Sequence, residues 1–210
     1  MTPSPPPARP YEPMVHLVDD EAPVRDALAF LFQSHGLAVR TYASGPAFLA
    51  ALELGPLAGC VVLDVRMEPL SGLQVHDALV AQGIGVPVMF LTGHGDVPLA
   101  VGALKKGAFE FFEKPFNDNQ LVDRVLDAMR ADEALRRERA LAGDLAARLA
   151  QLTPREREVM DLVVSGEHNK GIADALSIAV RTVEVHRAHV FDKMGVRSAV
   201  ELAGLLARSR

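Results

Sequence analysis

The sequence predicts an α/β protein in which a doubly wound (βα)5 parallel sheet is followed by a second, small all-α domain of four helices. Short apolar runs alternate with helix-patterned stretches as far as about residue 130, which is typical of βα repeats. A longer helical pattern follows, and residues 151–210 contain only short helical patterns separated by brief turns. A chain of 210 residues is long enough to form two such cores.

Five strand candidates in the first part are short apolar runs. They are Met14–Val18, Leu37–Tyr42, Gly59–Asp64, Pro87–Thr92 and Phe109–Glu113. The stretches between and after them repeat apolar residues at three- and four-residue spacing and are expected to be helices: Val24–Ser34, Pro46–Leu54, Ser71–Gln82, Val97–Lys106 and Asp118–Met129. In doubly wound sheets the ligand lies beyond the carboxyl ends of the strands, so the chemistry is expected at that edge.

The pattern stays helical from Leu121 to Leu152, which predicts a long or jointed helix between the domains. A sustained coiled coil is the less favoured alternative, because the stretch between Leu135 and Leu145 is charged and contains Gly143. The expected organisation is a disordered tail over 1–12, a sheet domain over 13–130, a helical linker over 131–150 and the small domain over 151–210.

The four short helices of the last segment have clear boundaries. Thr153 is a good N-cap, Pro154 suits the first helical position, and Glu156 completes a capping box, so a helix is expected to run to about Val164. The following helices are predicted over Asn169–Leu176, Val180–Met194 and Ser198–Arg208. Only a few residues separate the middle two, which indicates a helix-turn-helix.

Composition argues against membrane and secreted classes. No run of 18 apolar residues is present, and the N-terminal MTPSPPPARP is rich in proline and lacks the apolar core of a signal peptide. We therefore expect a cytoplasmic protein with no membrane partner. The single cysteine, Cys60, lies in the apolar run GCVVLDV and is expected to pack as a small hydrophobic residue.

Charge is divided unevenly along the chain. Residues 1–130 contain nine Lys and Arg against fifteen Asp and Glu, residues 131–150 contain four against four, and residues 151–210 contain nine against eight. The acidity therefore belongs to the sheet domain. A net charge of +1 over the last segment is no basic patch, so nucleic-acid binding must be inferred from the motif and its helix faces.

Polar side chains gather at the predicted strand ends. Asp19 and Asp20 follow the first strand, Asp64 ends the third, Thr92 ends the fourth, and Lys114 follows the fifth. A parallel sheet brings these positions to one edge. Mg²⁺ favours a few carboxylates together with water and phosphate oxygens, so Asp20 and Asp64 are candidate ligands. The hydroxyl of Thr92 and the ammonium of Lys114 would then hold the oxygens of a phosphoryl group.

The motifs VDDE, VVLDVRM, FLTGHGD and FEKPF, in this order, resemble the receiver domain of two-component response regulators over about residues 13–130. The runs GHGDVPLAV and EKPF are similar to its FixJ branch. The resemblance implies that Asp64 accepts a phosphoryl group from a phosphohistidine on a sensor histidine kinase. It also implies a site for Mg²⁺ (or Mn²⁺) formed by Asp19, Asp20, Asp64 and the backbone carbonyl of Arg66.

The same resemblance assigns the residues around the phosphoryl group. Thr92 and Lys114 would contact its oxygens, and Phe111 would be the switch aromatic that turns inward when Thr92 moves. The Lys114–Pro115 peptide is expected to be cis, as is usual in the family. An aspartate carboxylate is an adequate nucleophile toward an activated phosphoryl group when Mg²⁺ neutralises the developing charge.

Residues beside the site bear on the phosphorylated state. The family usually has proline four residues after the phosphoacceptor, whereas this chain has Glu68 there and Pro69 next, so an altered loop shape is expected. Arg66 and His94 occupy positions that in the family flank the attacking water, and we expect them to influence the lifetime of the phosphoryl group.

The run LTPREREVMDLVVSGEHNKGIADAL and the later RTVEVHRAHVFDKMGV resemble the LuxR-type helix-turn-helix of the NarL/FixJ family over about residues 150–208. On a helical wheel Val183, His186, Val190 and Met194 share the face expected to pack inside the domain, and His186 is expected to be a packed or capping residue rather than a metal ligand. The opposite face should enter the major groove of DNA. The expected DNA-binding residues are Lys170, Arg181, Thr182, Glu184, Val185, Arg187, Ala188 and Lys193, with Lys170, Thr182, Arg187 and Lys193 as candidate phosphate contacts.

The start of this recognition helix departs from the family pattern. Ala179 and Val180 occupy the places where a serine N-cap and a proline are frequent. The loss of a good cap is expected to weaken the helix start by about 1 kcal/mol. Ser177 is the nearby residue that would have to compensate.

The favoured function is a phosphorylation-activated transcription factor, and not an enzyme, that binds double-stranded promoter DNA. The resemblance implies a homodimer on phosphorylation through the surface that includes Val101 and Lys105, and RNA polymerase is a further candidate partner. A Mg²⁺-dependent phosphotransfer enzyme with Asp64 as nucleophile is the rival class, but it lacks a second acid-base aspartate shortly after Asp64. In a third alternative the C-terminal helices bind protein, and specific DNA retention would exclude it.

Overall fold

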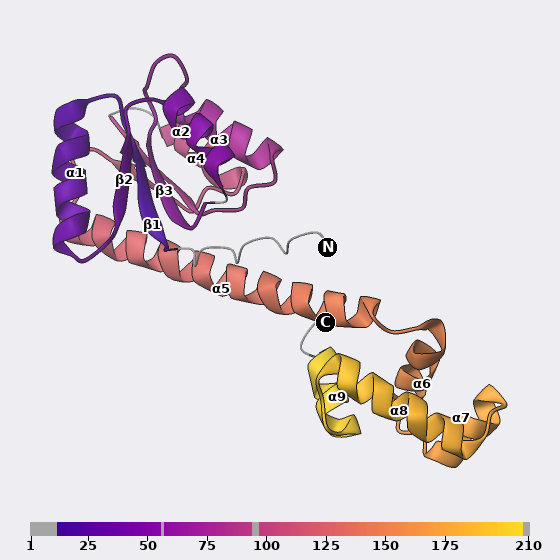
Figure 1. Cartoon of the computed structure of the whole chain (residues 1–210). Helices are drawn as coiled ribbons and strands as arrows, with labels where there is room; N and C mark the ends of the chain where they lie inside the picture. The colour runs from indigo at the N-terminus through magenta and orange to yellow at the C-terminus, as the bar shows by residue number, and fades with distance from the viewer. Residues whose placement is uncertain (1–11, 56, 94–96, 208–210) are drawn as a thin grey trace, which may run out of the picture. The chain divides into compact units, whose positions relative to one another are not determined.

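The computed structural model describes residues 12–55, 57–93 and 97–207. The predicted tail over 1–12, apart from Glu12, and the last predicted helical residue, Arg208, therefore lie outside the described residues. The chain divides into two compact units, Met1–Leu135 and Arg136–Arg210 (Figure 1).

The first unit is built on a five-stranded parallel sheet in the order β2-β1-β3-β4-β5. Its strands are β1 (Met14–Val18), β2 (Val39–Tyr42), β3 (Gly59–Asp64), β4 (Val88–Thr92) and β5 (Glu110–Glu113). All residues of β3 and β4 are buried, which is typical of parallel strands covered on both faces. All five predicted strands are confirmed, with β2 beginning two residues later than expected.

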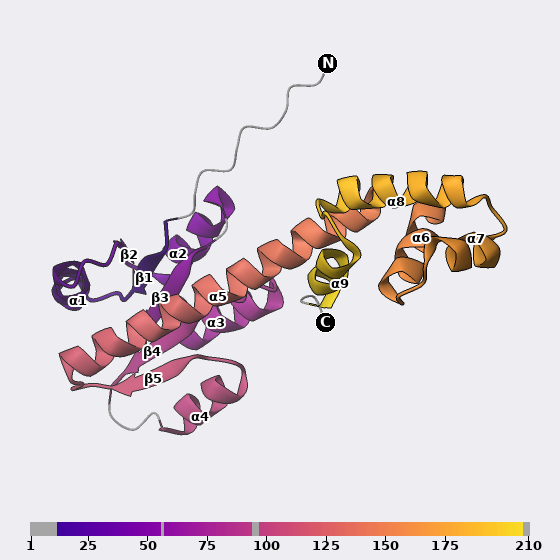
Figure 2. The same ribbon diagram turned by 90° about the horizontal axis from the view of Figure 1, so that it is seen from below.

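Helices cover both faces of this sheet (Figures 1 and 2). The helices α1 (Ala22–Ser34) and the first part of α5 (Asp118–Ala150) pack on one face. The helices α2 (Gly45–Ala51), α3 (Gly72–Ala81) and α4 (Val97–Lys105) pack on the other, and a short 3-10 turn, Leu52–Leu54, follows α2. Apolar side chains of α1 and α5 bury against one sheet face, and those of α2, α3 and α4 bury against the other, so the unit has two cores.

The linker is one uninterrupted helix, because α5 continues for 33 residues from Asp118 to Ala150. Of the two forms that the sequence allowed, the long helix is the one observed, and Gly143 does not break it. The last helix of the sheet domain was expected to end at Met129. Asp132 lies beyond that point and is buried. Its carboxylate accepts a hydrogen bond from the Gly59 N–H at 2.8 Å, which holds α5 against the amino end of β3.

The second unit contains four short helices, as predicted: α6 (Pro154–Val164), α7 (Asn169–Leu176), α8 (Val180–Met194) and α9 (Ala199–Ala207). The Thr153 hydroxyl accepts from the Glu156 N–H, and the Glu156 carboxylate accepts from the Thr153 N–H, so the predicted capping box is confirmed. Gly195 ends α8 with φ +66°, and Arg148 donates to the adjacent Met194 carbonyl at 2.6 Å. A cation at this helix end is favourable because it faces the negative end of the helix dipole.

Two proline peptides near the expected site are cis, Glu68–Pro69 and Lys114–Pro115. The prediction for Lys114–Pro115 is thereby confirmed. Among the helices of the described residues, none combines the length and the apolar character needed to cross a membrane.

Candidate functional site

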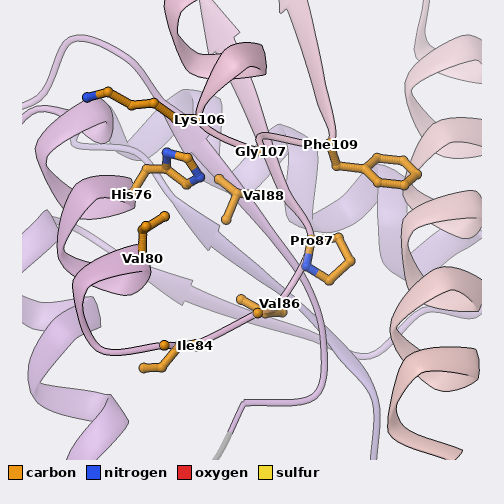
Figure 3. A pocket seen from close by; sticks show the side chains of 11 residues that line it. His76, Val80, Ile84, Val86, Pro87, Val88, Lys106, Gly107 and Phe109 are labelled. Carbon is orange, nitrogen blue, oxygen red and sulfur yellow. The ribbon is translucent and has the colours of Figure 1, made fainter. Parts of the chain in front are cut away.

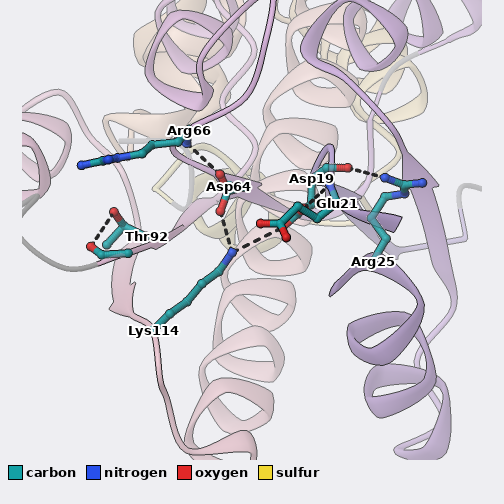
Figure 4. Close-up of polar contacts among 8 residues, drawn as sticks. Asp19, Glu21, Arg25, Asp64, Arg66, Thr92 and Lys114 are labelled. Carbon is teal, nitrogen blue, oxygen red and sulfur yellow. Dashed lines mark hydrogen bonds and ion pairs between the residues drawn. The ribbon is translucent and has the colours of Figure 1, made fainter. Parts of the chain in front are cut away.

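Acidic and basic side chains converge at the carboxyl edge of the sheet. Asp19 follows β1, Asp64 ends β3, and Lys114 follows β5. The ammonium nitrogen Nζ of Lys114 lies 2.7 Å from Oδ1 of Asp64 and 3.4 Å from Oδ2 of Asp19, and Figure 4 shows Lys114 reaching between the two carboxylates. Asp19, Asp64 and Lys114 form the acidic site. They are separated by up to 95 positions in the chain.

Backbone groups orient both carboxylates of the acidic site. The Arg66 N–H donates to Oδ2 of Asp64 at 2.7 Å, and the Glu21 N–H donates to Oδ1 of Asp19 at 2.8 Å. The Arg25 guanidinium donates to the Asp19 carbonyl at 2.8 Å, which ties the start of α1 to the end of β1 (Figure 4). The carboxylates are therefore held in position before any ligand binds.

Gly72 shows how closely the start of α3 approaches the end of β3. A Cβ atom at this position would overlap the Asp64 carbonyl oxygen. Glycine is required because no other residue leaves room for the strand end.

The acidic site holds two buried carboxylates for one ammonium. Burial raises the pKa of the Asp19 carboxyl above its ordinary value, although the Glu21 N–H and the Lys114 ammonium act in the opposite direction. Burial alone would lower the pKa of Lys114, but its hydrogen bond and attraction to Asp64, with Asp19 nearby, leave that pKa above its ordinary value. Lys114 is thus charged, and the site keeps an excess of negative charge that attracts cations.

Thr92 and Phe111 lie on β4 and β5, the two neighbouring strands that precede Gly93 and Lys114. Thr92 ends β4 and is buried, and its hydroxyl donates to the Gly93 carbonyl at 3.2 Å. The Lys114 N–H donates to the Thr92 carbonyl at 2.7 Å, so the backbones of these two residues are directly joined. Phe111 on β5 is half-buried, with its ring centroid 6.4 Å from that of Phe90 on β4. His94 lies outside the described residues.

The carboxylates of the acidic site suit a hard divalent cation. Asp20 is exposed beside Asp19, and the Arg66 backbone lies next to Asp64. The described residues contain no cluster of three or more His, Cys, Asp or Glu side chains with the geometry of a metal cage. Mg²⁺ does not need such a cage, because it is usually held by one or two carboxylates, with waters and phosphate oxygens completing its shell. The donor set present therefore fits this ion.

The recognition helix of the second unit is α8. Its inner face buries Val183, Val190 and Met194, and His186 lies half-buried with them, as the helical wheel predicted. Its outer face exposes Arg181, Thr182, Glu184, Val185 and Ala188. The Arg181 side chain is 87% exposed, and its guanidinium lies 2.9 Å from the Glu184 carboxylate. This outer face therefore exposes both polar and apolar side chains.

Two of the cations expected to contact phosphate have partners within the unit. The Lys193 ammonium lies 2.6 Å from the Glu156 carboxylate of α6. Arg187 donates to the Asn169 side-chain carbonyl at 2.9 Å, and its guanidinium carbon lies 5.5 Å from the centre of the Phe191 ring. Lys170, at the start of α7, is exposed.

The start of α8 has the weak cap that its sequence predicts. Ala179 is the N-cap and makes no side-chain hydrogen bond to the helix. Ser177 does not replace it, since it is the left-handed C-cap of α7 with φ 53°. Val183, which is buried three residues into α8, anchors this end of the helix in the core of the unit.

Comparison with known families agrees with this geometry. Residues 15–126 match the response regulator receiver domain, and residues 150–206 match the bacterial regulatory proteins of the luxR family. The chain belongs to the response regulators. Within this family it combines a receiver domain with a LuxR-type DNA-binding domain, so the predicted fold and the predicted class, a phosphorylation-dependent transcriptional regulator, are confirmed.

Several response regulators match almost the whole chain. The C4-dicarboxylate transport transcriptional regulatory protein DctR of Rhodobacter capsulatus is 54% identical over 191 residues, which are 90% of this chain and 96% of the relative. FixJ of Bradyrhizobium diazoefficiens is 45% identical over 195 residues, 93% of this chain and 95% of FixJ. The solved structure of the response regulator StyR is 38% identical, with a TM-score of 0.87, and the match covers 94% of this chain and 99% of StyR.

Sequence patterns missed three contacts of this response regulator. The Arg25 contact with Asp19, the Asp132 contact with Gly59 and the Lys193 contact with Glu156 each involve a charged residue that looks ordinary in its own helix. The only local signal was the capping box, which identified Glu156 but not its second partner.

Proposed function

We propose that Asp64 accepts a phosphoryl group from a sensor histidine kinase, and that the phosphorylated protein dimerises and binds promoter DNA through α8. The observation that carries the proposal is the acidic site, in which the carboxylates of Asp19 and Asp64 face one ammonium at the carboxyl edge of the sheet. Its place in a chain that also presents an exposed recognition helix supports a transcriptional output.

The transfer step needs few protein groups. One carboxylate oxygen of Asp64 forms a bond to phosphorus while the bond from phosphorus to the donor imidazole nitrogen breaks, and the histidine leaves with the electron pair of that bond. Bound Mg²⁺ would neutralise charge on the transferring phosphoryl oxygens. Asp19, Asp20, Asp64 and the Arg66 carbonyl would hold it. The Arg66 N–H orients the nucleophile throughout.

Lys114 and Thr92 would stabilise the product. The Lys114 ammonium now lies 2.7 Å from the Asp64 carboxylate, which phosphorylation would convert to an acyl phosphate. The ammonium would then contact a phosphoryl oxygen. The Thr92 hydroxyl, which now donates to a backbone carbonyl, would turn to the same group. Phe111 would then fill the space that Thr92 leaves and change the surface beside β5.

The dimer surface that we propose is formed by α4 and β5. The α4 surface includes Val101, which is 47% exposed, and the exposed Lys105. The strand β5 is the edge of the sheet and contains Phe111, so a switch at Phe111 changes the surface beside α4. Phosphorylation favours the dimer only if the altered surface is more stable in the dimer than the starting surface.

Dimerisation compensates for weak binding by one DNA-binding domain. The segment 151–210 has a net charge of only +1, so a single copy would bind DNA poorly at physiological salt. Two linked copies would place two α8 helices on half-sites about one helical turn apart and raise affinity through effective concentration. A cytoplasmic location and contact with RNA polymerase remain predictions.

Intact mass measured after treatment with acetyl phosphate and Mg²⁺ tests the phosphoacceptor. The wild type should gain one phosphoryl unit, and Asp64→Asn should gain none. Asp26→Asn, which changes an exposed carboxylate of α1, is the matched control and should behave as the wild type. A phosphoryl gain in Asp64→Asn would show that another residue is the phosphoacceptor.

Sedimentation velocity and DNA binding test the coupling. Phosphorylated wild type and Phe30→Asp, an exposed change on α1, should dimerise and retain operator fragments, while Val101→Asp should stay monomeric and bind weakly. The name of the DctR relative makes fragments upstream of C4-dicarboxylate transport genes the first to test. Tight binding by a phosphorylated monomer would instead favour release of the DNA-binding domain from an inhibitory contact.

A further inference from the structure

The turn between β1 and α1 contributes Asp19 and Asp20, two of the proposed Mg²⁺ ligands. Asp19 is fully buried, and its carboxylate accepts a hydrogen bond from the Glu21 N–H at 2.8 Å. The Asp19 N–H donates to the Tyr42 carbonyl at 3.2 Å, which joins the start of the turn to β2. Asp20 is exposed, so the direction of its side chain depends on how firmly the backbone of the turn is held.

A guanidinium group holds the main-chain carbonyl of Asp19. Arg25 on α1 is half-buried and donates to this carbonyl oxygen at 2.8 Å, six positions back in the chain (Figure 4). The carbonyl belongs to the peptide that joins Asp19 to Asp20. Because a peptide group is planar, a fixed carbonyl oxygen also fixes the Asp20 N–H. The contact therefore restricts the directions in which the Asp20 side chain can leave the backbone.

The local requirements of α1 do not account for an arginine at position 25. The helix begins with the residues APVR, so Arg25 is near its amino end, and the N-cap Glu21 makes no side-chain hydrogen bond to it. The amino end of a helix dipole is positive, so the helix itself does not favour a cation there. Residues that depart from such local rules are expected mainly at functional sites. The contact with Asp19 is what an arginine at this position provides.

We propose that Arg25 is a positioning residue for metal binding, which holds the Asp19–Asp20 peptide so that both carboxylates can face one divalent cation. The inference rests on the proposed Mg²⁺ site. Two effects of Arg25 on that site oppose each other, because its positive charge repels a cation while its hydrogen bond orders the ligands. The guanidinium bonds a main-chain oxygen and is partly open to solvent, which screens its charge, so the ordering effect is the larger.

Mg²⁺ titrations of the full chain, followed by amide NMR, test the sign of the effect. The wild type should show saturable shifts at residues 19–21 and 64–66. Arg25→Met has a side chain of similar reach without donors, and it should bind Mg²⁺ about tenfold more weakly, as is usual when a group behind a metal ligand is removed. Arg25→Lys retains a donor and should bind Mg²⁺ more tightly than Arg25→Met.

Phosphorylation by acetyl phosphate separates metal binding from the transfer step. With limiting Mg²⁺, Arg25→Met should be phosphorylated more slowly than the wild type. With saturating Mg²⁺ its rate should return to the wild-type rate, because the Arg66 N–H still orients Asp64. A general loss of structure would lower the rate at every Mg²⁺ concentration.

Two variants are matched controls and should bind Mg²⁺ as the wild type does. Arg130→Met removes a guanidinium that also donates to a main-chain carbonyl, that of Leu126 at 3.3 Å, on the exposed side of α5. Lys106→Met removes a cation at the other edge of the sheet, where Lys106 lines a cavity at the amino ends of β4 and β5 (Figure 3).

The outcomes distinguish the positioning role from the metal site itself. Absence of saturable shifts in the wild type would overturn the proposed Mg²⁺ site and this inference with it. If the wild type binds Mg²⁺, equal or tighter binding by Arg25→Met would overturn the role of Arg25 alone. Binding by Arg25→Lys that is as weak as that of Arg25→Met would also exclude the hydrogen bond to Asp19 as the cause.

Discussion

Each unit of the molecule contains a buried carboxylate paired with a lysine, and the two pairs differ in how completely the charge is satisfied. In the receiver, Lys114 lies 2.7 Å from Asp64 but also serves Asp19 at 3.4 Å. In the second unit, Lys193 lies 2.6 Å from Glu156, whose carboxylate also accepts the Thr153 N–H of the capping box. In the receiver two carboxylates share one ammonium, whereas Glu156 has the Lys193 ammonium to itself and also accepts from a backbone N–H.

The pKa directions express the same difference. Burial raises the pKa of the Asp19 carboxyl, so its charged form is disfavoured in the folded receiver. The Lys193 hydrogen bond, with the Thr153 backbone, lowers the pKa of Glu156 to about 2, so its charged form is favoured. A carboxylate group that is proposed to bind a cation and a phosphoryl group needs negative charge that its neighbours do not neutralise. A carboxylate that joins α6 to α8 is most stable when its charge has a cationic partner of its own.

The largest expected effect on DNA binding follows from removing the shared ammonium. Lys114→Met should still gain a phosphoryl unit from acetyl phosphate, but the ammonium that holds the phosphoryl oxygens is gone. The gain in operator affinity on phosphorylation should fall about tenfold or more. Fluorescence anisotropy with and without acetyl phosphate measures this ratio. Lys106→Met, whose ammonium is exposed and paired with Asp77, should keep the wild-type ratio, and an unchanged ratio in Lys114→Met would contradict the assigned role.

The two units should differ in their stability toward acid. Burial lowers the pKa of His16 in β1 from 6.5 to about 4, so the folded receiver favours the neutral ring. The corresponding stability is present above pH 6.5 and is lost as pH falls through about 4, and it amounts to about 3 kcal/mol. Glu156 acts in a lower window, because its contribution is present above pH 4.5 and is lost as pH falls through about 2.

Hydrogen exchange of the full chain, followed by mass spectrometry between pH 7 and pH 4, resolves the two units. The receiver should lose protection first. His16→Leu should remove most of the receiver's pH dependence in this range, while His35→Gln, an exposed change, should leave it intact. Simultaneous loss of protection in both units of the wild type would show that His16 does not control the acid response.

A smaller effect is expected from neutralising the satisfied carboxylate. Glu156→Gln keeps the size of the side chain but replaces the charged hydrogen bond to Lys193, so the second unit should lose about 2 kcal/mol of unfolding free energy. Urea denaturation monitored by exchange in α6 and α8 measures the loss. Glu184→Gln, which removes an exposed carboxylate paired with Arg181 on α8, should cost less than about 0.5 kcal/mol. Equal losses would mean that the Glu156 pair is no more stabilising than a surface pair.

The smallest expected effect concerns the lifetime of the phosphoryl group. Arg66 and His94 are expected from the sequence to flank the attacking water. Replacing both with alanine should therefore change the dephosphorylation rate severalfold by altering access of water to phosphorus. The decay of the phosphorylated mass after removal of acetyl phosphate measures this rate. A rate equal to that of the wild type would exclude both side chains from control of the lifetime.

The strand ends were predictable because each apolar run is followed directly in the chain by the polar residue that marks its end. Asp64 follows a fully apolar run, and the parallel sheet that the alternation implies places it beside Lys114, fifty residues later. The capping residues Thr153 and Glu156 were predictable for the same reason, because a capping box depends on residues three apart. The individual roles of the site residues and of the α8 surface stay predictions.

Only the tertiary structure shows which charged side chains pair with each other. The sequence left open whether the linker was one helix or two, since a single glycine at 143 costs only about 1 kcal/mol in a helix. It could not show that Lys193 pairs with Glu156, because the two residues are 37 positions apart on different helices. Local patterns arise from neighbours in the chain, and they determine where a helix or strand begins and which face is apolar. Charge pairing depends on distances of about 3 Å between side chains from different elements, and only packing of the folded chain sets those distances.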